Sequence, residues 1–119
     1  MGNMDFKDVS NIRSIYLTTI GRKTGKPHTV EVWFSYERGN VYLSHEGKYT
    51  DWMKNIIKDG SIELKINNKK FKGIARIVQD EMTFDKAKNS LYLKYYGQAD
   101  REVVDDWFSE STIIEVMLI

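Results

Sequence analysis

Alternation of apolar and polar residues marks six short segments of the chain as β-strands. In the longest of them Val30, Val32 and Phe34 share one face, and mostly polar residues occupy the other. The six predicted strands are residues 13–20, 28–37, 41–45, 61–66, 71–78 and 112–119. Turn residues at 38–40 and 67–70 separate neighbouring strands closely enough to form hairpins, so we expect antiparallel pairing.

Apolar residues at helical spacing predict helices between some of these strands. Thr50 or Asp51 caps a helix that carries Trp52, Ile56 and Ile57 and stops at residues 59–60. A longer helix begins at residue 80, places residues 84, 87, 91 and 95 on one face, and ends at residue 97. Shorter helices are predicted at 4–11 and 101–108. The order favours a mainly β fold, a six-stranded, partly open antiparallel barrel with peripheral helices, although periodicity alone also allows another α+β sheet.

Composition limits the classes of function. The chain has 119 residues, of which 41% are hydrophobic, so we expect a single domain spanning residues 1–119. The net charge of +1 gives no global field for nucleic acid or an anionic membrane. The absence of cysteine excludes disulfides, thiolate nucleophiles and cysteine metal sites, and it favours the cytoplasm. No apolar run reaches the roughly 18 residues of a membrane span.

The basic turn, residues 21–28, is the strongest candidate for a binding site. It carries Arg22, Lys23, Lys26 and His28 between two predicted strands. It is not a P-loop, because only three residues separate Gly21 from the Gly-Lys pair and a strand follows rather than a helix. Charge-assisted hydrogen bonds from these side chains suit an anionic group, and the alternative is a solvated surface loop.

The remaining chemistry-bearing residues are less specific. Trp33 and Trp52 suit either a flat ring system or the packing of a core or dimer interface. His28 and His45 without a carboxylate pattern make a poor metal site, so no metal is expected. The chain contains no Gly-x-Ser-x-Gly motif and no other recognisable nucleophile. If the protein is an enzyme, a cofactor therefore carries the chemistry.

These segments together resemble the split β-barrel flavin and deazaflavin oxidoreductases. The similarity is greatest to the deazaflavin (F420)-dependent nitroreductase branch, which is related to the pyridoxamine 5′-phosphate oxidase-like proteins. The elements that carry it are TTIGRKTGKP at residues 18–27, Trp33 in the second strand, Ser44 near the end of the third, and Asp51-Trp52 with Asn55 at the start of the helix. A looser similarity extends over almost the whole chain.

The resemblance implies a six-stranded split barrel of the FMN-binding type that binds coenzyme F420 or FMN. It implies an oxidoreductase that transfers hydride to a small conjugated, quinone-like or nitro acceptor, and a homodimer. The implied cofactor residues are Arg22, Lys23, Lys26 and His28 at the phosphate, assisted by Thr24 and Gly25, with Trp33 and Ser44 near the ring and Trp52 and Asn55 on the closing helix. Tyr96 is a candidate proton donor.

Two positions depart from the family pattern. His45-Glu46 stands where the family has Gly-Gly, and His28 stands where the nitroreductase branch often has arginine. Side chains there crowd a ring that otherwise meets bare backbone, which weighs against F420 more than against flavin-type binding in general. Two alternatives remain: a non-catalytic flavin- or deazaflavin-binding protein on the same barrel, and a small nucleic-acid-binding barrel, which the near-zero net charge disfavours.

Overall fold

The structure is a computed structural model that describes residues 12–46, 49–95 and 111–119. Its elements are β1 (Ser14–Ile20), β2 (Pro27–Glu37), β3 (Asn40–Glu46), α1 (Asp51–Lys58), β4 (Ser61–Ile66), β5 (Lys69–Ile77), α2 (Glu81–Tyr95) and β6 (Ser111–Leu118). All the predicted strands and both of the longer helices are therefore present. The helices predicted at 4–11 and 101–108, and the predicted helix end at residue 97, lie outside the described residues. Neither described helix is long and apolar enough to cross a membrane.

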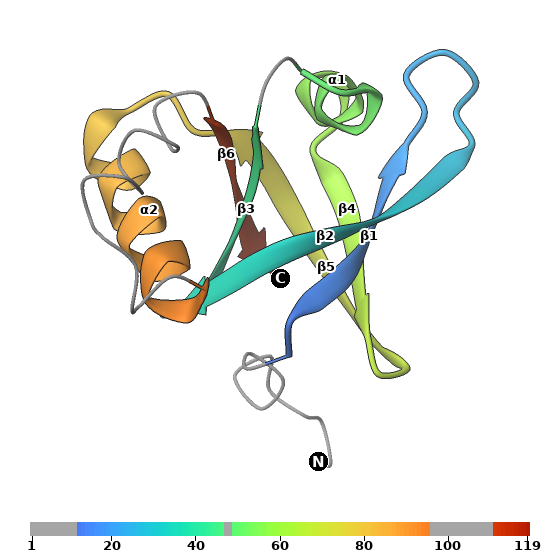
Figure 1. Cartoon of the computed structure of the whole chain (residues 1–119). Coiled ribbons are helices and arrows are strands. Elements are labelled where there is room, and N and C mark those ends of the chain that lie inside the picture. The colour runs from blue at the N-terminus through green and yellow to red at the C-terminus, as the bar shows by residue number, and fades with distance from the viewer. Residues whose placement is uncertain (1–11, 47–48, 96–110) are drawn as a thin grey trace.

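The strands form one antiparallel barrel in the order β1-β2-β3-β6-β5-β4 (Figure 1). The predicted six-stranded split barrel with peripheral helices is confirmed. The pairing of β1 with β4, which sets Leu17 opposite Leu64, closes the ring where the sequence predicted a partly open barrel. Tight turns join β2 to β3 and β4 to β5, as the hairpin prediction required.

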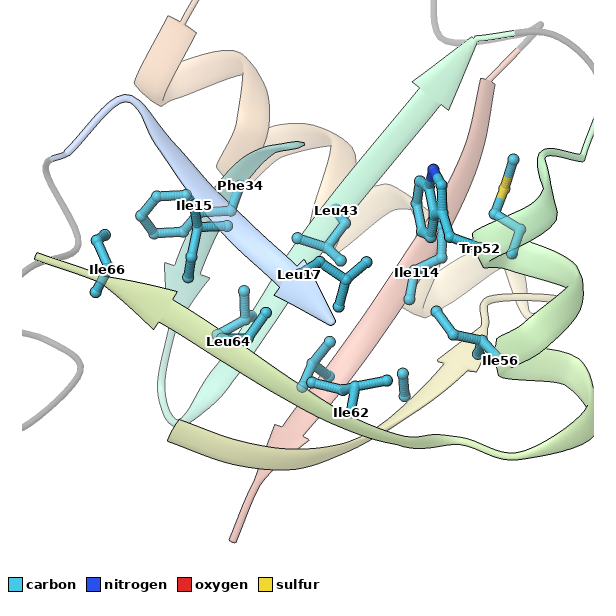
Figure 2. Close-up of a cluster of buried hydrophobic side chains, with 14 residues drawn as sticks. Ile15, Leu17, Phe34, Leu43, Trp52, Ile56, Ile62, Leu64, Ile66 and Ile114 are labelled. Carbon is cyan, nitrogen blue, oxygen red and sulfur yellow. The ribbon is translucent and has the colours of Figure 1, made fainter. Parts of the chain in front are cut away.

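The barrel interior is filled by the apolar residues of the alternating strands. Leu17, Leu43 and Leu64 have no solvent-exposed surface. Figure 2 shows Trp52 and Ile56 extending from α1 toward this cluster, so α1 covers one end of the barrel. Ile57, which the sequence placed with the apolar residues of this helix, is instead 60% exposed because it falls on the opposite side.

The outer face of the barrel carries a second cluster beneath α2. Ala87 and Leu91 of this helix are buried with Tyr42 of β3 and Ile113 of β6. Helix α2 also contacts β2, so it covers the side of the barrel formed by β2, β3 and β6 (Figure 1). The predicted apolar face of this helix is confirmed.

The last turn of α2 is anchored to the main chain of β2 and of the segment before β1. The Lys94 ammonium donates to the carbonyl oxygens of Ile12 at 2.7 Å and Phe34 at 2.9 Å. It also lies 3.4 Å from the centroid of the Phe34 ring. The Tyr95 hydroxyl accepts from the Phe34 N–H at 3.1 Å. Burial at this position lowers the pKa of Lys94 to about 8.

Stability should therefore rise with pH through Lys94. The lysine pKa in the unfolded chain is about 10.4, so between about pH 8 and 10.4 the unfolded state binds a proton that the folded state has released. The neutral amine keeps two N–H groups for its two carbonyl partners. Urea unfolding across this window, compared with Lys94→Met, measures the effect. A rise in the wild type that the variant lacks is expected, and parallel pH profiles would contradict it.

Candidate functional site

A cleft of about 590 Å³ lies between the basic turn and α1. In Figure 1 the loop between β1 and β2 projects beyond the barrel on the side where α1 lies. The cleft is lined by Gly21, Arg22, Lys23, Thr24, His28, Thr29, Val30, Thr50, Asp51, Trp52 and Asn55. The sequence-predicted residues Arg22, Lys23, Thr24, His28, Trp52 and Asn55 thus meet at one site, although the turn and the helix are separated by two strands in the chain.

Internal hydrogen bonds give the basic turn its shape. The Gly21 N–H donates to the Lys26 carbonyl at 2.7 Å, and the Gly25 N–H donates to the Gly21 carbonyl at 2.8 Å. Gly25 has a φ of 73°, a conformation that favours glycine. A Cβ at Gly21 would lie 2.9 Å from both His28 Nε2 and Thr24 Oγ1. Glycine at position 21 therefore lets the imidazole and the hydroxyl approach the backbone at the edge of the cleft.

Arg22 is held against α1 by both its main chain and its side chain. Asn55 Oδ1 accepts from the Arg22 backbone N–H at 3.1 Å and from Nη1 at 3.0 Å. Nη2 forms an ion pair with Asp51 Oδ1 at 3.2 Å, and Nη1 also donates to the Asp51 carbonyl at 3.3 Å. The guanidinium is thus fixed at the cleft wall, and its side chain remains 25% exposed.

The helix residues that hold Arg22 share one face of α1. Asn55, which is only 4% exposed, donates through Nδ2 to the hydroxyl of buried Thr19 at 3.1 Å. The Lys58 ammonium donates to the Arg22 carbonyl at 3.0 Å. Asp51, Asn55 and Lys58 lie at i, i+4 and i+7, so a single helical stripe contacts this arginine.

Lys23 and His28 add positive or donor character to the cleft beside Arg22. Both are exposed, and neither side chain has a hydrogen-bond partner among the described residues. On the helix side the Thr50 hydroxyl is buried, and it also lacks a partner within the described part of the chain. The donor set of one guanidinium, one ammonium, one imidazole and nearby hydroxyls suits a phosphate or carboxylate.

Sequence comparison with protein families supplies the decisive observation. Residues 5–103 match the family model described as F420H(2)-dependent quinone reductase. The chain belongs to this family. It is accordingly an oxidoreductase of an F420-dependent family, and the expected relationship to the F420-dependent split barrels is confirmed. A search of curated protein sequences found no match.

Solved structures with the same fold agree with the family match. A conserved hypothetical protein from Mycobacterium tuberculosis superposes with a TM-score of 0.76 at 20% identity, covering 98% of this chain and 81% of its own. An F420 reductase gives 0.69 at 16% identity, with 100% and 96% coverage. A pyridoxamine 5′-phosphate oxidase-like protein from Listeria innocua gives 0.65 at 11%, with 95% and 91% coverage. At these identities the likeness establishes the split-barrel fold.

The residues present in the cleft fit the anionic part of F420. That cofactor carries a phosphate and a carboxylate-bearing tail, and the cleft offers three basic side chains and a buried hydroxyl that has no partner among residues 12–46, 49–95 and 111–119. A second cavity of about 390 Å³ shares Gly21, Arg22, Lys23 and Thr24 with the cleft and is completed by Ile20, Gly25, Lys58 and Asp59. Basic groups of the family member thus border two adjoining cavities.

Other predicted site residues lie away from the cleft. Trp33 is 39% exposed and stacks on Tyr95, with ring centroids 4.7 Å apart, while the Arg13 guanidinium lies 4.8 Å from its centroid. Ser44 pairs with Ile113 in the sheet and does not line the cleft. Lys26 is exposed on the same turn but does not line it either. Tyr96 lies outside the described residues.

Sequence reasoning missed the roles of Asp51, Lys58 and Thr50. Asp51 is part of the predicted motif and one of the two predicted caps, but the structure places Thr50 at the N-cap position, without a side-chain capping hydrogen bond, and pairs Asp51 with Arg22 instead. The i, i+4, i+7 spacing of residues 51, 55 and 58 was the available signal, because it places their side chains on one face. Among the described residues no group of three or more potential ligands is placed to hold a metal ion.

Proposed function

We propose that this family member uses F420H2 to reduce a small conjugated, quinone-like or nitro acceptor, with the cofactor phosphate held in the cleft between the basic turn and α1. The supporting observation is Arg22, which Asn55 and Asp51 hold at the cleft wall beside Lys23 and His28. A cationic group fixed before the ligand arrives loses little conformational entropy on binding.

The chain's own residues divide the work of binding. Arg22, Lys23 and His28 donate to the anionic group, Thr24 and the Gly25 backbone assist at the turn, and Trp52 forms the apolar wall. Lys26, which is exposed on the turn, contributes long-range attraction. Bound F420H2 supplies the hydride. Trp33 and Ser44 are proposed ring-side residues, and Tyr96 is a proposed proton donor to the reduced acceptor.

Titration with F420 and, separately, with FMN tests the cofactor proposal. Trp52 lines the cleft, so its fluorescence should be quenched as the cofactor fills the site. We expect saturable binding of F420 in the micromolar range or tighter, about −8 kcal/mol, and weaker binding of FMN. Tighter binding of FMN than of F420 would mean that the cofactor is a flavin. If neither cofactor binds, the proposed function is wrong.

A non-catalytic carrier is the alternative that the sequence leaves open, although the family match favours a reductase. Turnover separates the two functions. A carrier binds F420 without accelerating its oxidation by a quinone or a nitro compound, whereas the proposed reductase accelerates it.

A homodimer and a cytoplasmic location also stay proposals. Ile74 and Met117 pair across β5 and β6 and are 49% and 61% exposed, so adjoining strands present apolar surface that a second copy would cover. Light scattering of the purified protein measures the mass in solution.

A further inference from the structure

Arg22 has two side-chain partners on α1 that differ in charge and in burial. Asn55 is neutral and 4% exposed, and its amide is fixed by the Thr19 hydroxyl. Asp51 carries a carboxylate that forms an ion pair with the guanidinium, and its side chain is 87% exposed. Arg22 is the only hydrogen-bond or ion-pair partner of the Asp51 side chain within the described part of the chain. The two partners therefore differ in how easily each can leave the guanidinium.

Asp51 contacts the guanidinium group that would bind an incoming anion. Its carboxylate accepts from Nη2 at 3.2 Å, and it lines the same cleft as Arg22. An anion that bonds to Arg22 in a bidentate manner through Nη2 approaches the nitrogen that Asp51 already contacts, and it meets a like charge on Asp51. Asn55 uses Nη1 without cancelling the positive charge, so it can remain in place while the anion binds.

We propose that Asp51 is a displaceable counter-ion that competes with the anionic cofactor for Arg22 and so lowers cofactor affinity. This inference rests on the proposed function, because it concerns the same cleft. In the unliganded protein Asp51 keeps the guanidinium against α1, and on binding its exposed carboxylate turns into solvent while Asn55 retains the arginine. Asp51 thus lowers the affinity for the cofactor and Asn55 supports it, although both residues contact the same guanidinium.

The test is the dissociation constant of F420 for Asp51→Asn, measured by tryptophan quenching at low salt. An exposed ion pair is a weak competitor, so we expect affinity to increase by about two- to fivefold. The gain should shrink as salt is raised, because the difference is one of charge. A variant that merely loosened the helix would bind more weakly at every salt concentration.

Glu81→Gln is the matched control. Glu81 is also an exposed acidic residue in the first turn of a helix, but it belongs to α2 and does not line the cleft. The Glu81→Gln substitution removes one negative charge from a comparable position. The comparison therefore separates the effect of a charge close to Arg22 from the effect of the net charge of the protein. Equal gains in both variants would overturn the inference, as would unchanged or weaker binding by Asp51→Asn with an unchanged melting temperature.

Inorganic pyrophosphate distinguishes failure of this inference from failure of the proposed function. If Asp51→Asn binds pyrophosphate more tightly than the wild type does, and neither protein binds F420, the counter-ion role of Asp51 is supported and the F420-dependent function is contradicted. If the wild type binds F420 and Asp51→Asn binds it no more tightly, the proposed function is supported and the counter-ion role of Asp51 is contradicted. If neither probe binds to either protein, both are overturned.

Discussion

Arg22→Ala is expected to weaken F420 binding by about 10- to 100-fold. Hydrogen bonds to charged groups contribute about 1.5–3 kcal/mol each, and the arginine presents its charge in a fixed position beside Lys23. Arg22→Lys should recover only part of the loss, because an ammonium cannot reproduce the planar fork that contacts Asp51 and Asn55. The dissociation constants of the three proteins measure this effect.

A pair of lysine variants separates the effect of a cleft cation on affinity from the effect of net charge. Lys23→Ala removes an exposed cleft cation without disturbing a described hydrogen bond, so we expect weaker binding and an unchanged fold. Lys69→Ala removes an exposed lysine at the start of β5, next to the β4–β5 turn at the end of the barrel away from α1 (Figure 1). Equal losses in both would mean that overall charge, not the cleft, controls affinity.

Asn55→Ala is expected to destabilise the fold by about 2–4 kcal/mol, because it removes a buried group that is bonded to both Arg22 and Thr19. The Thr19 hydroxyl, which has no exposed surface, is left without this donor. Urea unfolding gives the free energy of unfolding. The neighbouring Lys54→Ala, exposed on the same helix, should change it by less than about 0.5 kcal/mol.

Asn55→Asp separates the charge of this residue from its shape. The carboxylate can accept from Arg22 and from the Thr19 hydroxyl, so we expect the fold to survive better than in Asn55→Ala. It also places a buried negative charge against the guanidinium, so F420 should bind more weakly than to the wild type. An Asn55→Asp protein with wild-type affinity would show that the neutrality of this partner is unimportant.

The sequence predicted the barrel well because its strands are buried on one face. The alternation of Ile62, Leu64 and Ile66 fixes which face of the strand points inside, because a slip of one residue would expose all three, and all three are buried. The closure of the ring was not predictable in the same way. Closure depends on the pairing of β1 with β4, and the alternation of residues within a strand does not indicate which other strand it pairs with.

Prediction of the site depended on how local its parts are. The cations of the basic turn are contiguous in sequence, so their clustering was evident before the fold was known. The ion pair of Arg22 with Asp51 joins residues 29 positions apart, and only the packing of α1 beside the turn brings them together. Trp33 shares a strand with His28, yet it stacks on α2 rather than lining the cleft, because β2 is long.

His45-Glu46, which stands where related proteins have Gly-Gly, is a weaker argument against F420 than the sequence suggested. The His45 ring lies edge-on to Trp52, with centroids 6.3 Å apart and planes at 86°, so this side chain packs on α1. The match to the F420H2-dependent family favours F420 in spite of these two positions. Contact with a cleft residue gives His45 a packing role that the sequence pattern did not reveal.

Oxidation of F420H2 by a soluble quinone, followed by the return of the visible absorbance of F420, tests the central claim most directly. We predict turnover by the wild type that saturates with F420H2, with a KM raised by Lys23→Ala and left unchanged by Lys69→Ala. Oxidation at the uncatalysed rate in the presence of protein that binds F420 would contradict the claim of a reductase. Turnover that Lys23→Ala leaves unchanged would contradict the location of its cofactor site.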